Sequence, residues 1–337
     1  GYKRTKVPET YHATGRDENG NLIKQQIRTG SELSDPVRSA MSGTKRIYIE
    51  AALNYARVFG DIHDVTAMLL YNQKETQYQN GEALGILPYR KQNFVARASY
   101  AYDRRYVLEA SMGMTGSENF ASGHRWGIFP AFGFAWNIGE EKFLKESTDI
   151  FNKLRLRASF GITGNDAIGN NTRFPYRESM NLNANNGYPL GFSGGAGQSG
   201  GTNNKGNGIS EGTIAMPYLS WEKERKIDVG IDLGMFNGAI DMTLDYFNNR
   251  RTDILLQRRT MLNVTGIRNA PWQNIGIVNN QGIEGSLNLK QKIGEVNLSA
   301  LGNFTYAKNK IIEYDEVPTA FEYQSITGRS LGKPYVY

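Results

Sequence analysis

Few side chains in this sequence have the types and spacing that metal binding requires. Asp17-Glu18-Asn19-Gly20-Asn21 has the acidic and amide residues of a calcium loop, but it lacks the bidentate Glu in register, which favours a hairpin turn instead. His12, His63 and His124 are scattered without the spacing of metal ligands, and we expect His63 near a turn at the start of a strand. The sequence therefore predicts no metal site.

Acidic pairs and glycine-rich segments are equally weak candidates for catalysis. Glu140-Glu141 has the composition of an acid/base pair, but adjacent side chains at a turn usually point apart, so we expect a solvated helix start there. Residues 187–212 are rich in glycine yet contain no Gly-Lys-Ser/Thr and no flanking strand–helix unit, so they do not predict a phosphate loop. Cysteine is absent, which excludes thiolate metal sites and a cysteine nucleophile. We expect no enzyme, no catalytic residue and no cofactor.

The strongest pattern is an alternation with a period of two residues. After the turn at residues 103–105 the alternation resumes on a second segment, and the opposite parity is mostly polar, with Val95 and Val107 as exceptions. Because successive side chains of a strand point to opposite faces, this pattern predicts a hairpin with one apolar and one polar face. The apolar set is Phe94, Ala96, Ala98, Tyr100, Tyr102, Tyr106, Leu108, Ala110, Met112 and Met114.

Four further hairpins repeat this pattern, which gives ten strands in all. Asn237-Gly238 predicts a two-residue type I′ turn, and Gly60-Asp61 and Gly294 mark two other turns. The linker 140–153 is long enough for a short helix. The strands cover residues 47–55 with 65–71, 132–138 with 154–162, 227–235 with 240–246, and 283–289 with 296–306. Longer polar connections cover residues 73–90, 115–128, 164–218 and 249–281.

Composition agrees with a membrane β-barrel better than with the other classes. Mean hydropathy is −0.51 and no apolar run approaches the ~18 residues of a spanning helix, but a spanning strand needs only ~9–11 residues, half of them polar. The 11% aromatic content argues against disorder. The net charge of +6 is spread along the chain without a basic block, so we expect no nucleic-acid partner.

The alternation of short turns with long loops predicts an all-β fold, part of a large antiparallel transmembrane β-barrel with short periplasmic turns and long extracellular loops. We expect residues 1–44 to form an extracellular loop segment and residues 45–337 to form the partial barrel domain. The chain begins without a signal peptide, so we expect a processed chain or a piece of a longer one.

Several segments, in order, resemble the SusC/RagA family of TonB-dependent outer-membrane transporters of Bacteroidetes. The closest are FVARASYAYDRRYVLEASMGMTGSENF (94–120), GIFPAFGFAWNIGEEKFLK (127–145) and KLRLRASFGITGN (153–165). Residues 219–256, 274–289 and 303–311 continue the likeness. One local departure is Met112-Gly113-Met114-Thr115-Gly116-Ser117, where the family often has Arg-x-Asp-Gly-Ser.

The resemblance implies a wall segment of a larger machine. Plugged transporters of this kind close with ~22 strands, so ten strands correspond to a partial barrel. We recognise no TonB box, plug domain or aromatic-ended final strand, and residues 332–337 resemble a Gly-x-Pro stretch that precedes further strands in the family. The implied location is the Gram-negative outer membrane, and the implied activity is TonB-energised import of oligosaccharides or oligopeptides with a SusD-like surface lipoprotein.

Three sets of residues are candidates for the functional surfaces. We expect Arg155, Arg157, Asp228 and Asp232 to face the lumen, either toward solute or packed against a plug. Loop aromatics that we expect to stack on solute are Trp126, Tyr188, Phe192, Tyr218 and Trp272. An aromatic girdle at the periplasmic interface with outer-membrane lipid is expected from Tyr100, Tyr102, Tyr106, Trp136 and Phe236.

Two alternatives remain open on the sequence alone. One is a passive porin or adhesin barrel without a plug, and the other is a soluble carbohydrate-binding β-sandwich, which would bury the aromatic residues against a second sheet. The sequence does not identify the solute.

Overall fold

The computed structural model describes residues 2–3, 9–29, 37–38, 43–78, 87–145, 150–168, 173–184, 188–189, 208–261 and 270–332. By contacts the chain divides into two compact units. The first comprises residues 1–47 and 75–89, and the second comprises residues 48–74 and 90–337. Among the described residues, no helix has both the length and the apolar character needed to cross a membrane.

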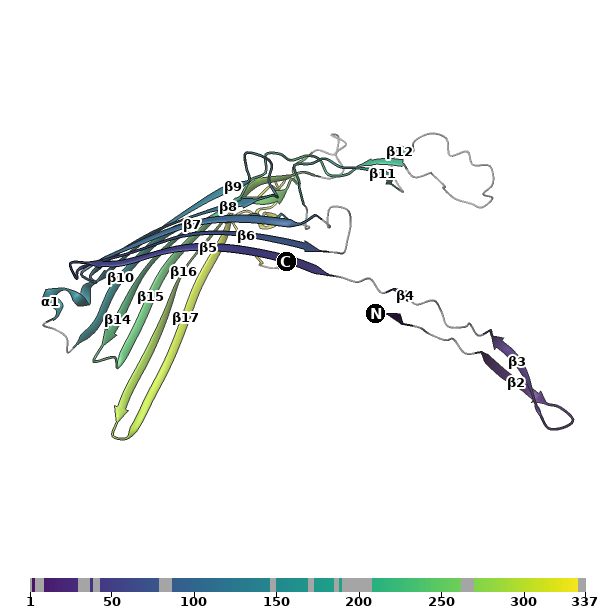
Figure 1. The fold of residues 1–337 in the computed structure, drawn as a ribbon, viewed down its shortest axis with the longest axis horizontal. Helices are drawn as coiled ribbons and strands as arrows, with labels where there is room; N and C mark the ends of the chain where they lie inside the picture. Colours follow the sequence, from purple (N-terminus) through teal and green to yellow (C-terminus); the bar gives the residue numbers. More distant parts are fainter. Residues whose placement is uncertain are drawn as a thin grey trace. The chain divides into compact units, whose positions relative to one another are not determined.

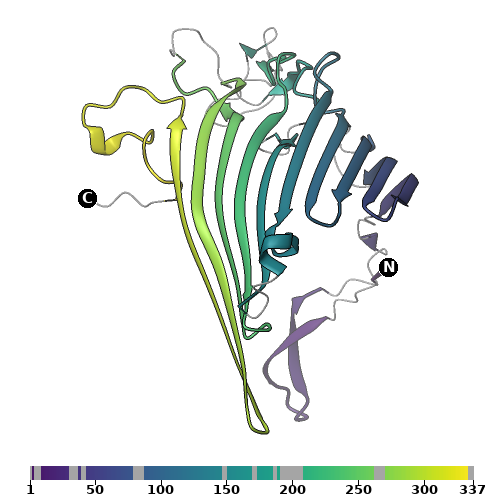
Figure 2. The ribbon, with the colours of Figure 1, turned by 90° about the vertical axis from the view of Figure 1, so that its left-hand side faces the viewer.

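Ten strands form one antiparallel sheet in which neighbours in space follow the order of the sequence (Figures 1 and 2). This confirms the predicted all-β class and the ten predicted strands. The strands are β5 (Thr44–Phe59), β6 (His63–Tyr78), β7 (Tyr89–Tyr102), β8 (Tyr106–Ser117), β9 (Trp126–Asn137), β10 (Phe151–Asn165), β14 (Glu222–Met235), β15 (Ile240–Gln257), β16 (Trp272–Ile293) and β17 (Val296–Glu313).

Four of the five hairpin turns are short, as predicted: residues 60–62, 103–105, 236–239 and 294–295. The connection within the third pair, residues 138–150, breaks the alternation, because it is longer than the connections 79–88 and 118–125. The linker 138–150 contains the 3₁₀-helix η1 (Ile138–Glu140) and the helix α1 (Lys142–Lys145), which confirms the predicted short helix. Three of the long connections are shorter than expected, because the strands continue beyond their alternating apolar segments; the connection expected at 249–281 covers only 258–271. The connection expected at 164–218 covers residues 166–221.

Strand register keeps one parity of side chains on one face from β7 to β17. Starting at Tyr100, directly opposed residues from β7 to β17 are Leu108, Phe134, Ala158, Val229, Tyr246, Ile283 and Tyr306. The row one residue away runs through Ser99, Glu109, Gly133, Ser159, Asp228, Phe247, Gly282 and Ala307. We call the first side the apolar face and the second the polar face.

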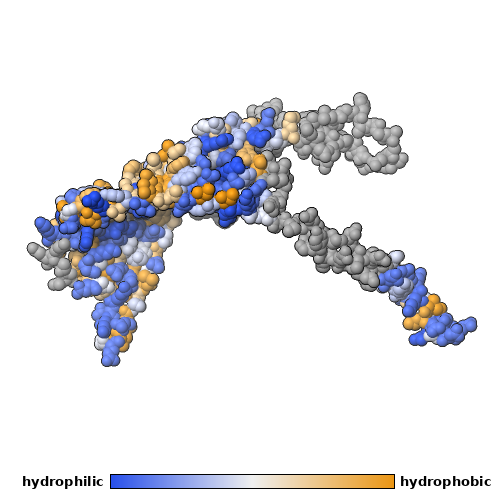
Figure 3. Space-filling model, in the orientation of Figure 1, coloured by the Kyte–Doolittle hydropathy of each residue, from blue (hydrophilic) through white to orange (hydrophobic). Residues whose placement is uncertain are grey.

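The apolar face is exposed rather than packed against a second layer. Leu108, Val229 and Tyr306 are 52%, 50% and 65% exposed. In Figure 3, hydrophobic residues gather over the middle of the strands and hydrophilic residues gather toward the strand ends. A soluble β-sandwich would bury such a face against another sheet. The observed sheet therefore does not fit the sandwich alternative.

The small buried core of the described residues lies at the roots of the long connections instead of between sheets. Its members come from the β8–β9 connection, from the β10–β14 connection and from the end of β15. They are Phe120, Ile168, Met216, Leu219, Trp221 and Leu255, with Phe129 and Trp272 packed against them.

The hairpin turn between β14 and β15 differs from the predicted type I′ turn at Asn237-Gly238. Strand pairing ends at Met235 and Ile240, so the turn has four residues, 236–239. Phe236, Asn237 and Gly238 in this turn all have positive φ. The amide of Phe236 donates to the carbonyl oxygen of Ile150 at 2.9 Å, which draws Phe236 out of the strand ladder. A contact from the neighbouring linker, which local turn rules do not include, thus sets the turn length.

We expected a loop before residue 44, but part of this segment is regular. Strands β2 (Thr10–Arg16) and β3 (Leu22–Arg28) form an antiparallel hairpin. The Asp17 carboxylate accepts hydrogen bonds from the amides of Asn19 and Asn21 at 2.9 and 2.8 Å, which closes the turn. This confirms the hairpin-turn interpretation of the Asp17–Asn21 stretch.

Candidate functional site

Charged residues on the polar face are linked across three strands by one arginine. Arg157 of β10, Gly230 of β14 and Asp245 of β15 lie directly opposite one another. Arg157 Nη2 donates to Asp245 Oδ1 at 2.9 Å, and Arg157 Nε donates to Asp232 Oδ1 at 3.2 Å. A guanidinium can satisfy two carboxylates at once because its five N–H donors are fixed in one plane.

Glycine at position 230 is what allows this arginine to cross the intervening strand. A Cβ atom on Gly230 would lie 1.9 Å from Asp245 Oδ1 and 2.9 Å from Arg157 Nη2. Any side chain there would occupy the path of the ion pair. The glycine is therefore explained by close approach of charged groups over the backbone, the role that glycine often has within strands.

The four predicted lumen candidates do come together on the polar face. Arg155 lies opposite Asp232, and Asp228 lies opposite Ser159, two residues along from the Arg157 row. Lys153 Nζ is 3.8 Å from the second oxygen of Asp232. Asp245 is not among the predicted lumen residues, although its alternation with Asp241 and Thr243 on β15 was a usable signal. Whether these residues face a solute remains a prediction.

A cavity of about 350 Å³ lies farther toward the long-connection end of the same face. Its floor includes a row of directly opposed asparagines, Asn249, Asn280 and Asn309, from β15, β16 and β17. The neighbouring row brings Glu224, Arg251, Val278 and Ile311 together. Aliphatic and aromatic lining comes from Ile254, Leu256, Tyr314 and Leu331. The cavity thus combines amide donors and acceptors, charges of both signs and apolar surface.

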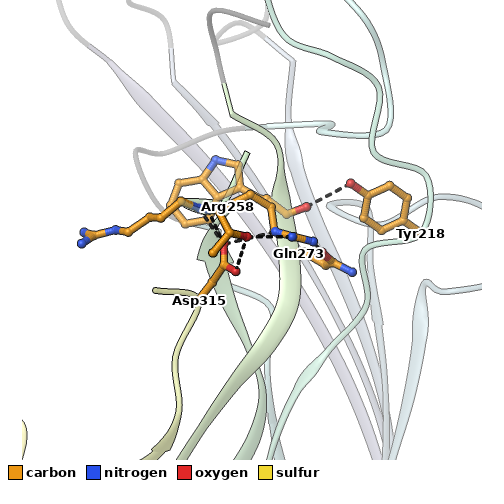
Figure 4. A network of polar contacts seen from close by, with 7 residues as sticks. Tyr218, Arg258, Gln273 and Asp315 are labelled. Atoms are coloured by element: carbon orange, nitrogen blue, oxygen red, sulfur yellow. Dashed lines mark hydrogen bonds and ion pairs between the residues drawn. The ribbon is translucent and has the colours of Figure 1, made fainter. Parts of the chain in front are cut away.

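Two consecutive carboxylates after β17 fix the connections around this end of the sheet. Asp315 accepts hydrogen bonds from the amide of Arg259 at 2.6 Å and from Thr260 Oγ1 at 2.8 Å, and it pairs with Arg258 Nε at 3.1 Å (Figure 4). Arg258 also donates to Gln273 Oε1 at 2.7 Å. One side chain therefore ties the segment after β17 to the end of β15 and the start of β16.

Glu316 holds the following turn in the same way. Its oxygens accept from the amides of Ile326 and Thr327 at 2.7 and 2.9 Å and from Ser325 Oγ at 2.7 Å. Partial burial acts to raise the pKa of Glu316, but these hydrogen bonds to the ionised form outweigh it and lower the pKa to about 2. The turn continues into residues 328–331, which bond to Ile311 and Asn309 of β17.

The predicted loop aromatics do not form one cluster. Tyr218 donates through its hydroxyl to the carbonyl oxygen of Trp272 at 3.2 Å, and Trp272 packs on the core at the loop roots (Figure 4). Trp126 lies opposite Gly116 on the apolar face, with its ring 6.1 Å from that of Phe94. This position favours contact with the surroundings of the apolar face over contact with solute. Tyr188 lies in β12 (Tyr188–Pro189), and Phe192 is outside the described residues.

At the short-turn end, a band of rings follows the apolar face. The rings of Tyr102 and Tyr106 are stacked at 6.4 Å and those of Tyr106 and Trp136 at 6.2 Å, while His63 at the start of β6 lies 5.4 Å from Tyr102. His63 Nδ1 is also 2.8 Å from the hydroxyl of Tyr100. This arrangement is the geometry that the predicted girdle requires; its contact with lipid remains a prediction.

Glu141 is buried against this band, which contradicts the expected solvated helix start. It accepts from Tyr106 Oη at 2.6 Å, from Trp136 Nε1 at 3.1 Å and from Arg105 Nη1 at 3.0 Å. The hydrogen bond from Tyr106, with those from Trp136 and Arg105, lowers the pKa of Glu141. Sequence spacing did not reveal this contact, because Arg105 and Glu141 belong to different turns of the sheet.

Comparison with known proteins finds a family that matches nearly the whole chain. The family described as TonB dependent receptor-like, beta-barrel, matches residues 2–335. A TonB-dependent receptor of Formosa agariphila is 29% identical over 317 residues, covering 86% of this chain and 28% of the relative. The TonB-dependent receptor SusC of Bacteroides thetaiotaomicron is 32% identical over 200 residues, covering 59% of this chain and 18% of SusC. The chain thus spans less than a third of the length of these curated relatives.

Among solved structures, the RagAB peptide importer in its closed-closed state has a similar fold. The TM-score is 0.63 at 22% identity, and the match covers 86% of this chain and 33% of the solved chain.

Replacing Gly230 by alanine tests the crossing of Arg157. We expect Gly230→Ala to separate Arg157 from Asp245 and to lower the free energy of unfolding by about 1–3 kcal/mol, since a largely buried carboxylate loses its partner. Urea unfolding of the full-length protein measures this. The matched control is Gly133→Ala on the same face, where the new Cβ would meet Glu109 at 3.7 Å, an ordinary contact. Equal effects of the two substitutions would show that Gly230 is not required for the ion pair between Arg157 and Asp245.

The depressed pKa of Glu316 predicts how the turn at 325–327 responds to acid. Stabilisation by this carboxylate is complete above its ordinary pKa of 4.5 and is lost as the pH falls through about 2. Hydrogen exchange at the amides of Ile326 and Thr327, corrected for intrinsic rates, should therefore be equally slow at neutral and mildly acidic pH. Glu316→Gln should accelerate it at neutral and mildly acidic pH, where the carboxylate is ionised, whereas Glu322→Gln in the same segment should not. Fast exchange of the Ile326 and Thr327 amides in the unsubstituted protein at neutral pH would contradict the stabilisation of this turn by Glu316.

Proposed function

This chain belongs to the family of TonB-dependent receptor-like β-barrels, and from that membership we propose that it forms part of the wall of a SusC-like outer-membrane importer. The importer takes up an oligosaccharide or an oligopeptide, is energised through TonB and works with a SusD-like surface lipoprotein. The chain contributes the lipid-facing surface, the polar surface of the lumen and the extracellular connections. It makes and breaks no covalent bond in its solute.

The observation that carries this proposal is the separation of the two faces in register across the sheet. An exposed apolar row from Tyr100 to Tyr306 suits hydrocarbon, and the charged polar face suits a lumen that admits water and a polar solute. A membrane-spanning sheet pairs its backbone groups between neighbouring strands, and the antiparallel ladders join each neighbouring pair from β7 to β17.

The cavity on the polar face favours the oligopeptide among the two solute classes. Its lining of asparagine amides matches peptide N–H and C=O groups, and its Glu224, Arg251 and Glu313 offer partners for charges of both signs. The apolar lining is mainly aliphatic, whereas sugars are commonly held by stacking on aromatic rings. Of the loop aromatics expected to provide such stacking, Trp272 packs on the loop core and Trp126 lies on the apolar face.

The alternative that remains compatible with the structure is a passive barrel, because the wall of a porin also has one apolar and one polar face. Uptake of fluorescently labelled oligopeptides and oligosaccharides by cells of the source organism separates the two functions. We expect deletion of the gene to abolish uptake of one solute class, and we expect deletion of TonB to abolish the same uptake. Uptake that persists without TonB would favour the passive barrel.

A pair of substitutions on β16 adds a test of the cavity to the same assay. Asn280→Leu removes an amide from the cavity, and we expect the half-saturating concentration of peptide to rise by about 2–10-fold, the effect of one lost hydrogen bond. Asn288→Leu is the matched control, because Asn288 is also on the polar face of β16 but lies opposite Asp241 near the short-turn end. An equal effect of both variants would contradict a solute site in the cavity.

A further inference from the structure

The linker between β9 and β10 folds onto the apolar face rather than under the lumen. Tyr106 and Trp136 lie directly opposite each other, and Trp136 lies opposite Leu156, on the face that carries Leu108 and Phe134. Glu141 of the linker accepts hydrogen bonds from both rings, at 2.6 and 3.1 Å. Its carboxylate is therefore held on the apolar side of the sheet.

Further contacts fix the linker in this position. Arg105, in the neighbouring turn, pairs with Glu141 at 3.0 Å and lies over the rings of Tyr102 and Tyr106, at 5.7 and 5.8 Å from their centres. The amide of Asn137 donates to the carbonyl oxygen of Arg105 at 2.7 Å. The amide of Leu144 bonds to the carbonyl oxygen of Glu141, which starts the helix α1 immediately after the buried carboxylate.

The helix presents an unpartnered aromatic side chain between basic residues. Its sequence is Lys142-Phe143-Leu144-Lys145, and Phe143 is 64% exposed, more than any other phenylalanine among the described residues. Figure 1 shows α1 at the short-turn end of the strands, beside β10. An exposed ring flanked by lysines, next to the band of Tyr102, Tyr106 and Trp136, has the composition of a segment that lies at a lipid–water boundary.

We propose that residues 138–145 form an interfacial anchor on the outside of the barrel, with Phe143 inserted in the periplasmic leaflet of the outer membrane and Lys142 at the phospholipid phosphates. The inference rests on the proposed function, since it requires the apolar face to contact lipid. The occupant of this surface is the lipid leaflet, because Glu141 of the anchor is bonded to Tyr106 and Trp136 of the apolar face, the face that contacts lipid in the proposed function.

Nitroxide labels at three phenylalanine positions test the anchor. The full-length protein, free of other cysteines, is placed in nanodiscs of phosphatidylethanolamine and phosphatidylglycerol and labelled at Phe143→Cys, Phe132→Cys or Phe321→Cys. All three side chains are well exposed, at 64%, 56% and 57%; Phe132 is on the apolar face, and Phe321 is in the segment after β17. The measurement is the ratio of spin-label collision with oxygen to collision with a water-soluble nickel chelate.

We expect the ratio at position 143 to lie several-fold above that at position 321 and to approach that at position 132. Adding Glu141→Gln, which removes the ion pair with Arg105, should lower the ratio at position 143 and leave the other two unchanged. A ratio at position 143 equal to that at position 321, with position 132 in lipid, would overturn the anchor alone. Position 132 in water would overturn the proposed membrane barrel itself, so the two failures are distinguishable.

Discussion

The constraint on which the rest of this structure depends is the register in which the strands β7 to β17 pair over their alternating segments. Because side chains alternate with a period of two, a shift of one residue between any two strands would move a charged row onto the apolar face. The observed register avoids this from β7 to β17, across a connection as long as residues 166–221. Backbone pairing and the separation of lipid from lumen are thus one property of the sheet.

Local features at the two ends of the sheet follow from that register. On the polar face, charges compensate one another within the wall, and Gly230 leaves room for Arg157 to reach Asp245 across a strand. At the end with long connections, Asp315 and Glu316 tie segments to the strands beside them, around a cavity lined by the asparagine row. At the other end, Glu141 is satisfied by rings of the apolar face.

The period-two pattern was enough to predict the strands, their pairing as hairpins and four of the five short turns, because these depend on residues close in sequence. Contacts between distant segments were not predictable in this way. Pairing of β10 with β14 brought Asp228 and Asp232 beside Arg155 and Arg157, but the crossing to Asp245 needs the register of a third strand. The burial of Glu141 and the length of the turn at residues 236–239 were misjudged, because residues of a neighbouring turn contact both. Trp126 was assigned to a loop because β9 begins earlier than its apolar run suggests.

The two-faced wall can be measured most directly by labelling β15 from Ile240 to Tyr246 with a fluorophore at single cysteines in the full-length protein and placing it in vesicles that contain nitroxide-labelled lipid. If one face of the wall contacts lipid, we expect strong quenching at the apolar-face positions Ile240, Met242, Leu244 and Tyr246. We expect weak quenching at the polar-face positions Asp241, Thr243 and Asp245. Quenching without this alternation, or at neither set, would contradict the two-faced wall.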